Sequence, residues 1–132
     1  MKTILLDAVY CFIIEEKEGK FVTFKEMYDL LETYSNKKII LTSASDDKRE
    51  LYGLNSMPYH VFTLKHNPEK TDPKYYETLL KHFNLGKDDV IYFEHSMDAV
   101  KSAESVGIKS YFYDNEKKDL ESLKKFLDEN LK

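Results

Sequence analysis

The segment Lys70–Asp114, KTDPKYYETLLKHFNLGKDDVIYFEHSMDAVKSAESVGIKSYFYD, decides the fold. A helix is predicted to start at Asp72 and Pro73, because aspartate caps the free N–H groups of a helix start and proline suits the first turn. The elements expected after it are a strand over 90–93, a helix from Ser96 to Gly107 and a strand over 109–113. Short apolar strands that alternate with helices predict an α/β protein with a mainly parallel sheet.

The same alternation extends through the rest of the chain. We expect apolar strands over 3–6, 38–41 and 59–64, a small hairpin over 11–22, and helices over 46–54 and 120–131. A further helix is expected after Thr23, because Thr23 and Glu26 have the spacing of a capping box. Five strands that are connected mostly by helices predict a mainly parallel sheet with right-handed crossovers. We therefore expect a three-layer α/β/α sandwich, in one domain over residues 1–132.

The composition narrows the class of protein. Apolar residues make up 42% of the 132 residues and charged residues 33%, a balance that excludes disorder. The net charge of −4 argues against nucleic-acid binding, because phosphate neutralisation needs a basic face. The single cysteine, Cys11, excludes a disulfide framework. No apolar run reaches the roughly 18 residues of a membrane span, and a signal peptide is not recognisable, so we expect a cytoplasmic protein without a membrane partner.

The parallel sheet also predicts where a site lies. In open α/β sheets, ligands bind beyond the carboxyl ends of the strands. The polar residues that the sequence places at those ends, or in the adjoining loop, are Asp7, Thr42, Ser43, Lys70, Glu94, His95 and Asp114. A carboxylate can act as a nucleophile, hydroxyl groups can hold phosphoryl oxygens, and a lysine can neutralise a developing anion. We therefore expect phosphoryl-transfer chemistry, with a small phosphorylated ligand or a phosphoprotein as the partner.

The order of these residues resembles the motifs of the haloacid dehalogenase (HAD) superfamily of aspartate-nucleophile hydrolases. Its first motif, a strand followed by D-x-D-G-T-L, is similar to DAVYCF at 7–12. Its second, a strand that ends in Thr or Ser, is similar to IILTS at 39–43. Its third motif often reads K-P-D-P before a helix and is similar to KTDP at 70–73, and its fourth is similar to VIYFEHS at 90–96. The resemblance covers nearly the whole chain.

The resemblance implies phosphomonoester hydrolysis through an aspartyl-phosphate on Asp7. It further implies that phosphoryl oxygens are bound by Lys70 and by the hydroxyl of Thr42 or Ser43. With the five sheet strands numbered along the chain, it implies the strand order 5-4-1-2-3. The hairpin over 11–22 then corresponds to the flap that the family carries beside its first strand.

Magnesium is the cofactor that the resemblance implies, with Asp7, Glu94 and Asp98 as the candidate ligands. His95 stands where the family usually has a magnesium-binding aspartate, and imidazole suits zinc, copper, iron or nickel better than magnesium. Three interpretations of His95 stay open. It is a ligand for another divalent metal, an acid–base group that activates water, or a hydrogen-bonded structural residue.

A second departure from the family is Val9, which occupies the position of the general acid/base aspartate. Valine can neither protonate a leaving group nor activate water, help that is worth roughly 10²- to 10⁴-fold in rate. Val9 and His95 together favour an alternative function, a non-catalytic protein that binds a phosphorylated ligand or a protein partner. Haloacid dehalogenases also lack this aspartate, so chemistry on carbon is a weaker alternative. Cys11 is interpreted as packing rather than as a nucleophile.

The spacing of the motifs leaves no room for a cap domain. The hairpin and one helix use most of the residues between 8 and 41, and a short helix and a strand fill the residues between 44 and 69. We therefore expect a capless protein whose site lies at an open rim. The alternative is a homodimer, in which a second copy of the chain provides a lid over the site.

Overall fold

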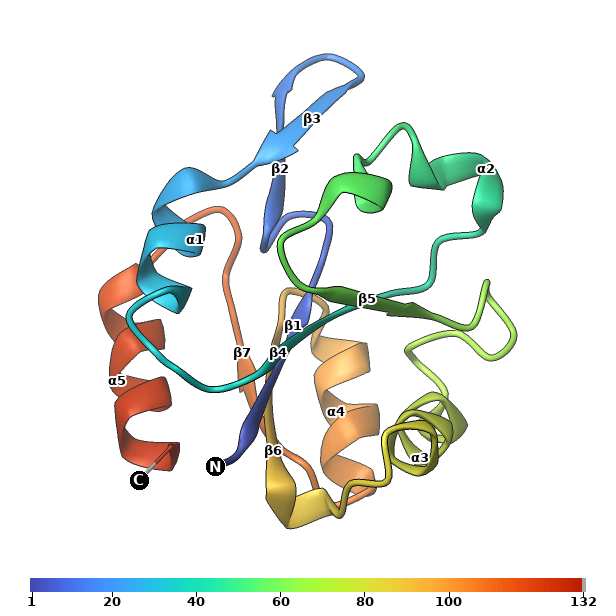
Figure 1. The fold of residues 1–132 in the computed structure, drawn as a ribbon, viewed down its shortest axis with the longest axis vertical. Helices are drawn as coiled ribbons and strands as arrows, with labels where there is room; N and C mark the ends of the chain where they lie inside the picture. The colour runs from blue at the N-terminus through green and yellow to red at the C-terminus, as the bar shows by residue number, and fades with distance from the viewer. Residues whose placement is uncertain (132) are drawn as a thin grey trace.

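The computed structural model describes residues 1–131, which form three layers around a central sheet (Figure 1). Within these residues the sheet contains β1 (Thr3–Asp7), β4 (Lys38–Thr42), β5 (His60–Thr63), β6 (Val90–Glu94) and β7 (Lys109–Phe112). The helices are α1 (Lys25–Leu31), α2 (Asp46–Arg49), α3 (Pro73–His82), α4 (Met97–Ser105) and α5 (Leu120–Asn130), with 3₁₀ turns η1 (Leu54–Ser56) and η2 (Lys87–Asp89). The strands β2 (Ile13–Lys17) and β3 (Lys20–Thr23) form a separate hairpin.

The strand order of the sheet is β5-β4-β1-β6-β7, and each neighbouring pair is parallel. This confirms the predicted order, with the first strand at the centre. Because β1 has a strand on each side and helices on both faces, all of its residues are buried. Its carboxyl end at Asp7 therefore lies between the ends of β4 and β6.

Helices cover both faces of the sheet (Figure 1). On one face, Leu31 of α1 and Leu127 of α5 belong to a single buried apolar core. On the other face, Tyr76 of α3 and Ala103 of α4 belong to a second buried core. Successive residues of a strand point to opposite faces, so each buried strand contributes side chains to both cores. This packing holds the strand ends, and the residues that follow them, in fixed relative positions.

Two details of the predicted helices are wrong. Thr23 does not cap α1, because β3 extends through Thr23 to pair with Ile13, and the N-cap is Phe24 without a side-chain hydrogen bond. The helix predicted over 46–54 ends at Arg49, and residues 50–53 form turns that finish at Gly53 with a left-handed φ of 67°. In the part of the chain that is described, no helix combines the length and the apolar character needed to cross a bilayer.

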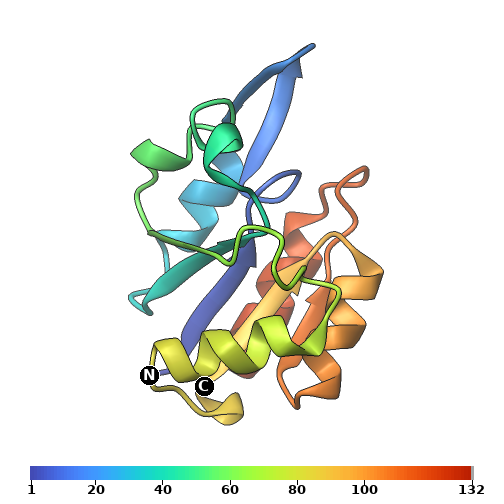
Figure 2. The same cartoon turned by 90° about the vertical axis from the view of Figure 1, so that its right-hand side faces the viewer.

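The hairpin and the α2–η1 segment extend beyond the carboxyl ends of the sheet strands (Figure 2). The hairpin expected over 11–22 forms over 13–23. Its Phe21 ring meets the ring of Tyr52 edge to face, with ring centroids 4.8 Å apart. The two segments therefore touch at the edge where the sequence predicts a site.

Candidate active site

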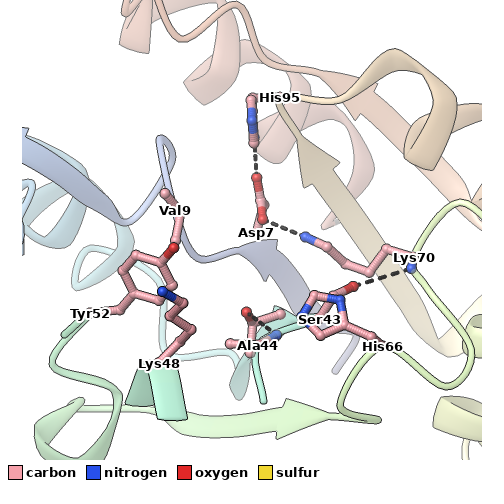
Figure 3. A pocket seen from close by; sticks show the side chains of 10 residues that line it. Asp7, Val9, Ser43, Ala44, Lys48, Tyr52, His66, Lys70 and His95 are labelled. Carbon is pink, nitrogen blue, oxygen red and sulfur yellow. Dashed lines mark hydrogen bonds and ion pairs between the residues drawn. The ribbon is translucent and has the colours of Figure 1, made fainter. Parts of the chain in front are cut away.

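A cavity of about 330 Å³ opens at the carboxyl ends of β1 and β4 (Figure 3). Predicted site residues that line it are Asp7, Thr42, Ser43, Lys70 and His95. They come from the ends of β1, β4 and β6 and from the loop before α3. Residues far apart in the sequence thus meet where the parallel sheet predicts a ligand site.

Asp7 is almost fully buried, and both of its carboxylate oxygens have a partner (Figure 3). Lys70 Nζ donates to Asp7 Oδ1 at 2.5 Å, and His95 Nδ1 donates to Asp7 Oδ2. The side chain of Asp7 is 3% exposed, whereas those of Lys70 and His95 are 13% and 28% exposed. The carboxylate therefore lies under two nitrogen groups that reach it from the solvent side of the sheet edge.

Glu94 is the second buried carboxylate of the site, and its side chain is 0% exposed. Lys70 Nζ donates to Oε1 at 2.7 Å, and the Tyr92 hydroxyl donates to the same oxygen. The backbone N–H of Ser96 donates to Oε2 at 3.1 Å, and His95 Nδ1 lies 3.2 Å from that oxygen. Every oxygen of this carboxylate is thus engaged by the protein. We call Asp7, Lys70, Glu94 and His95 the charged cluster.

The pKa values in the charged cluster follow from these contacts. Hydrogen bonds to Asp7 and Glu94 raise the pKa of His95 to about 9. Burial acts to lower the pKa of Lys70, but the charges of the two carboxylates outweigh it and raise that pKa. Burial acts to raise the pKa of Glu94, but the charge of Lys70 holds it well below its usual range. Burial and the charge of Glu94 raise the pKa of Asp7, against the opposing effects of Lys70 and His95.

Cys11 lies against Asp7, and its Sγ donates to Asp7 Oδ2 at 3.6 Å. The thiol is fully buried, and burial together with the charges of Asp7 and Glu94 raises its pKa well above the usual value. A protonated, buried thiol is a poor nucleophile, so its contacts agree with a packing role. Ligand atoms of Asp7, Cys11 and His95 lie within 4.8 Å of one another, a sulfur–nitrogen–oxygen set that suits zinc better than magnesium.

The hydroxyl groups of Thr42 and Ser43 hold the turn that follows β4. The backbone N–H of Ala44 donates to Thr42 Oγ1 at 3.1 Å. The backbone N–H of Lys70 donates to Ser43 Oγ at 3.2 Å, which fixes the base of the lysine beside the cavity. In both contacts the hydroxyl accepts, so its own O–H can still donate to an anion in the cavity.

The donor set at this edge does not fit magnesium. Magnesium requires near-octahedral oxygen ligands at about 2.0–2.1 Å. The oxygens of Asp7 and Glu94 already meet Lys70, His95 and other protein donors. Asp98 is exposed in the first turn of α4 and is not among the described residues that line the cavity. The structure thus brings two of the three candidate magnesium ligands together and leaves the third apart.

Sequence reasoning missed three residues whose polar side chains line the cavity: Lys48, Tyr52 and His66 (Figure 3). Lys48 belongs to α2, and Tyr52 follows one helical turn later, so the i, i+4 spacing was the available signal. His66 has a left-handed φ of 65° in the loop after β5, where its Nδ1 lies 2.7 Å from Glu69 Oε1. These residues add an aromatic ring and a lysine to the cavity.

By sequence, the chain matches no protein-family model and no curated protein. Solved structures with the same fold include a HAD family enzyme from Bacteroides thetaiotaomicron, an aspartate-to-alanine mutant in complex with magnesium and inorganic phosphate. That enzyme is 12% identical, with a TM-score of 0.69, over 85% of this chain and 93% of the other. An uncharacterized protein from Corynebacterium glutamicum is 14% identical, with a TM-score of 0.66, over 93% of this chain and 92% of the other.

A conserved haloacid dehalogenase-like protein of unknown function from Agrobacterium tumefaciens is also similar. It is 16% identical, with a TM-score of 0.57, over 69% of this chain and 45% of the other. Likeness at this level of identity concerns the backbone arrangement. The chain therefore has the HAD fold, in agreement with the resemblance of its motifs.

Proposed function

We propose that this protein hydrolyses phosphomonoesters, with Asp7 as the nucleophile that forms an aspartyl-phosphate. The observation that carries the proposal is the contact of Lys70 Nζ with Asp7 Oδ1, 2.5 Å apart, at the edge of a cavity. The lysine favours the ionised form of a buried carboxylate, and an ionised carboxylate facing a cavity can attack phosphorus. The HAD fold supports the proposal, as does the neighbour that binds magnesium and inorganic phosphate.

The reaction takes place in two displacements at phosphorus. In the first, an Asp7 oxygen attacks phosphorus and the bond from phosphorus to the ester oxygen breaks. The leaving oxygen takes its proton from solvent, because Val9 at the cavity edge has none to give. In the second, water attacks phosphorus, the bond to Asp7 breaks, and the proton lost by water stays on the released phosphate.

Residues around Asp7 stabilise the charge on the phosphoryl group. The O–H groups of Thr42 and Ser43 donate to phosphoryl oxygens, which their positions on the cavity wall favour. Lys70 supplies a fixed positive charge beside the attacking oxygen. Preorganised donors of this kind are usually the largest single contribution to catalysis.

The experiment is hydrolysis of 4-nitrophenyl phosphate by the wild-type chain and by Asp7→Asn. Asparagine keeps the shape of the side chain but removes the nucleophile, so we expect turnover to fall by about 10³-fold or more. His60→Asn is the matched control, because His60 is exposed at the amino end of β5, the opposite end from the site. Asp7→Asn activity equal to that of the control would refute the proposal.

A binding protein without turnover is the second candidate function. The observation that favours it is the engagement of both Asp7 oxygens, which adds to the absence of an acid at Val9. Calorimetry with inorganic phosphate distinguishes the two functions. Phosphate binding by the wild-type chain, together with no hydrolysis of any aryl phosphate, would establish the binding function instead.

A further inference from the structure

We propose that the side chain of His95 takes the place of a divalent cation at this site, so that the cavity binds a phosphoryl group without any metal. The inference rests on the proposed function, because it concerns the same cavity and the same ligand group. The contacts of His95, the space around it and the charges of the cluster support this role.

The contacts place His95 between the two buried carboxylates. Its Nδ1 donates to Asp7 Oδ2 and lies 3.2 Å from Glu94 Oε2. Its ring nitrogen thus supplies a polar partner to one oxygen of each carboxylate. The ring is held there on another side by Tyr10, whose ring meets it edge to face with centroids 5.5 Å apart.

Space between the carboxylates is already filled. A magnesium ion bound to Asp7 Oδ2 would sit about 2.1 Å from that oxygen. Because His95 Nδ1 contacts this oxygen, the ring would have to leave before the ion could bind. Its departure would also remove a partner of Glu94, whose carboxylate is 0% exposed and cannot turn to water for a replacement.

The charges of the cluster balance without an ion. Asp7 and Glu94 contribute two negative charges, and Lys70 together with protonated His95 contributes two positive charges. A buried carboxylate without compensation is costly, which is the usual reason for a bound cation at such a site. Lys48 adds a further positive charge to the cavity wall. An anionic ligand therefore meets a cavity with a net positive charge although no metal is bound.

The test is calorimetry with inorganic phosphate on the whole chain, after removal of metals and in the presence of a chelator. We expect wild-type binding in the chelator to equal binding with added magnesium, manganese or zinc. His95→Asn removes the cation and should weaken binding by about tenfold in every condition. His95→Asp supplies an acidic metal ligand, so its binding should be lost in the chelator and restored by magnesium.

Several outcomes would overturn the inference. Wild-type binding that needs magnesium, or zinc held by Asp7, Cys11 and His95, would show that a metal is required. Binding in the chelator by His95→Asn or His95→Asp at the wild-type level would show that His95 contributes no charge. Thermal unfolding of each variant confirms that it is folded, and the wild-type comparison does not depend on any variant.

The inference and the proposed function fail separately. Metal-free phosphate binding without hydrolysis of aryl phosphates would support the role of His95 and refute the hydrolase. Hydrolysis that depends on Asp7 but requires added magnesium would support the hydrolase and refute the role of His95. No phosphate binding in any condition would refute the role of His95, whereas the hydrolase is refuted by the turnover of Asp7→Asn.

Discussion

Lys70 Nζ donates to Asp7 Oδ1 at 2.5 Å although the two residues are 63 positions apart in the chain. The same nitrogen donates to Glu94 Oε1 at 2.7 Å. One lysine thus joins the ends of β1 and β6 through two carboxylates that are almost fully buried. This contact affects stability as well as chemistry, because buried carboxylates need a compensating charge.

Replacing Lys70 by methionine should strongly destabilise the protein. The change keeps most of the aliphatic stem but leaves Asp7 and Glu94 with one cation instead of two. Loss of one partner of a buried ion pair costs about 3–5 kcal/mol, and the free energy of unfolding in urea measures it. Lys74→Met is the control, because Lys74 is exposed in the first turn of α3. Equal stability of the two variants would contradict the role of Lys70.

The protonation of His95 should make stability depend on pH. Its pKa is raised from 6.5 to about 9 in the folded chain, so folding favours the protonated form. The stabilisation is fully present below pH 6.5 and is lost as the pH rises through 9. The difference in free energy of unfolding between wild type and His95→Asn should shrink by on the order of 2 kcal/mol over this range. A difference that stays constant with pH would count against a charged His95.

The absence of an acid at Val9 should make the rate sensitive to the leaving group. Aryl phosphates with acidic phenols should be hydrolysed fastest, because their oxygen leaves without a proton. Val9→Asp should speed the hydrolysis of alkyl phosphates by about 10²-fold, the lower end of general acid–base help. Val9→Asn adds polarity without a proton to transfer and is the matched control. A gain that Val9→Asn reproduces would point to a change other than acid catalysis.

Lys48 should select substrates that carry a second anionic group. It lines the cavity with Tyr52, so it can pair with a charge on the alcohol part of the ester. Lys48→Ala should raise the KM of such substrates by about tenfold and leave kcat unchanged, because the contact persists in the transition state. Arg49→Ala is the control of equal charge, since the Arg49 side chain donates to Asn55 Oδ1 at 2.9 Å outside the cavity lining. The same KM for both variants would exclude this role.

Much of the fold could be predicted because its elements carry local signals. Asp72 caps α3 by accepting from the N–H of Lys74, as its position before Pro73 indicated. The strand order was implied by the motif resemblance. The meeting of Asp7, Lys70 and Glu94 agrees with the rule that ligand sites lie at the carboxyl ends of parallel strands. The motif resemblance and the rule for the carboxyl ends of parallel strands indicated the same three residues. The position of these residues at one edge of the sheet was therefore predictable.

Other features could not be predicted because they depend on tertiary contacts. Thr23 has the sequence of a helix cap, but its pairing with Ile13 in the hairpin takes precedence. Asp98 stands four residues after the end of β6 at Glu94, yet the turn into α4 leaves it exposed. The orientation of His95 between two carboxylates is likewise set by packing. Sequence alone left three interpretations of that histidine open.

The edge-to-face contact between Phe21 and Tyr52 connects the hairpin to the wall of the cavity. Tyr52 lines the cavity, whereas Phe21 belongs to a strand whose tip at Gly19 has open space around it. A substitution near that tip that tilts β3 would shift the tyrosine ring and reshape the wall that faces the alcohol part of a substrate. Under the proposed function, changes in the hairpin would therefore alter substrate preference while the charged cluster stays the same.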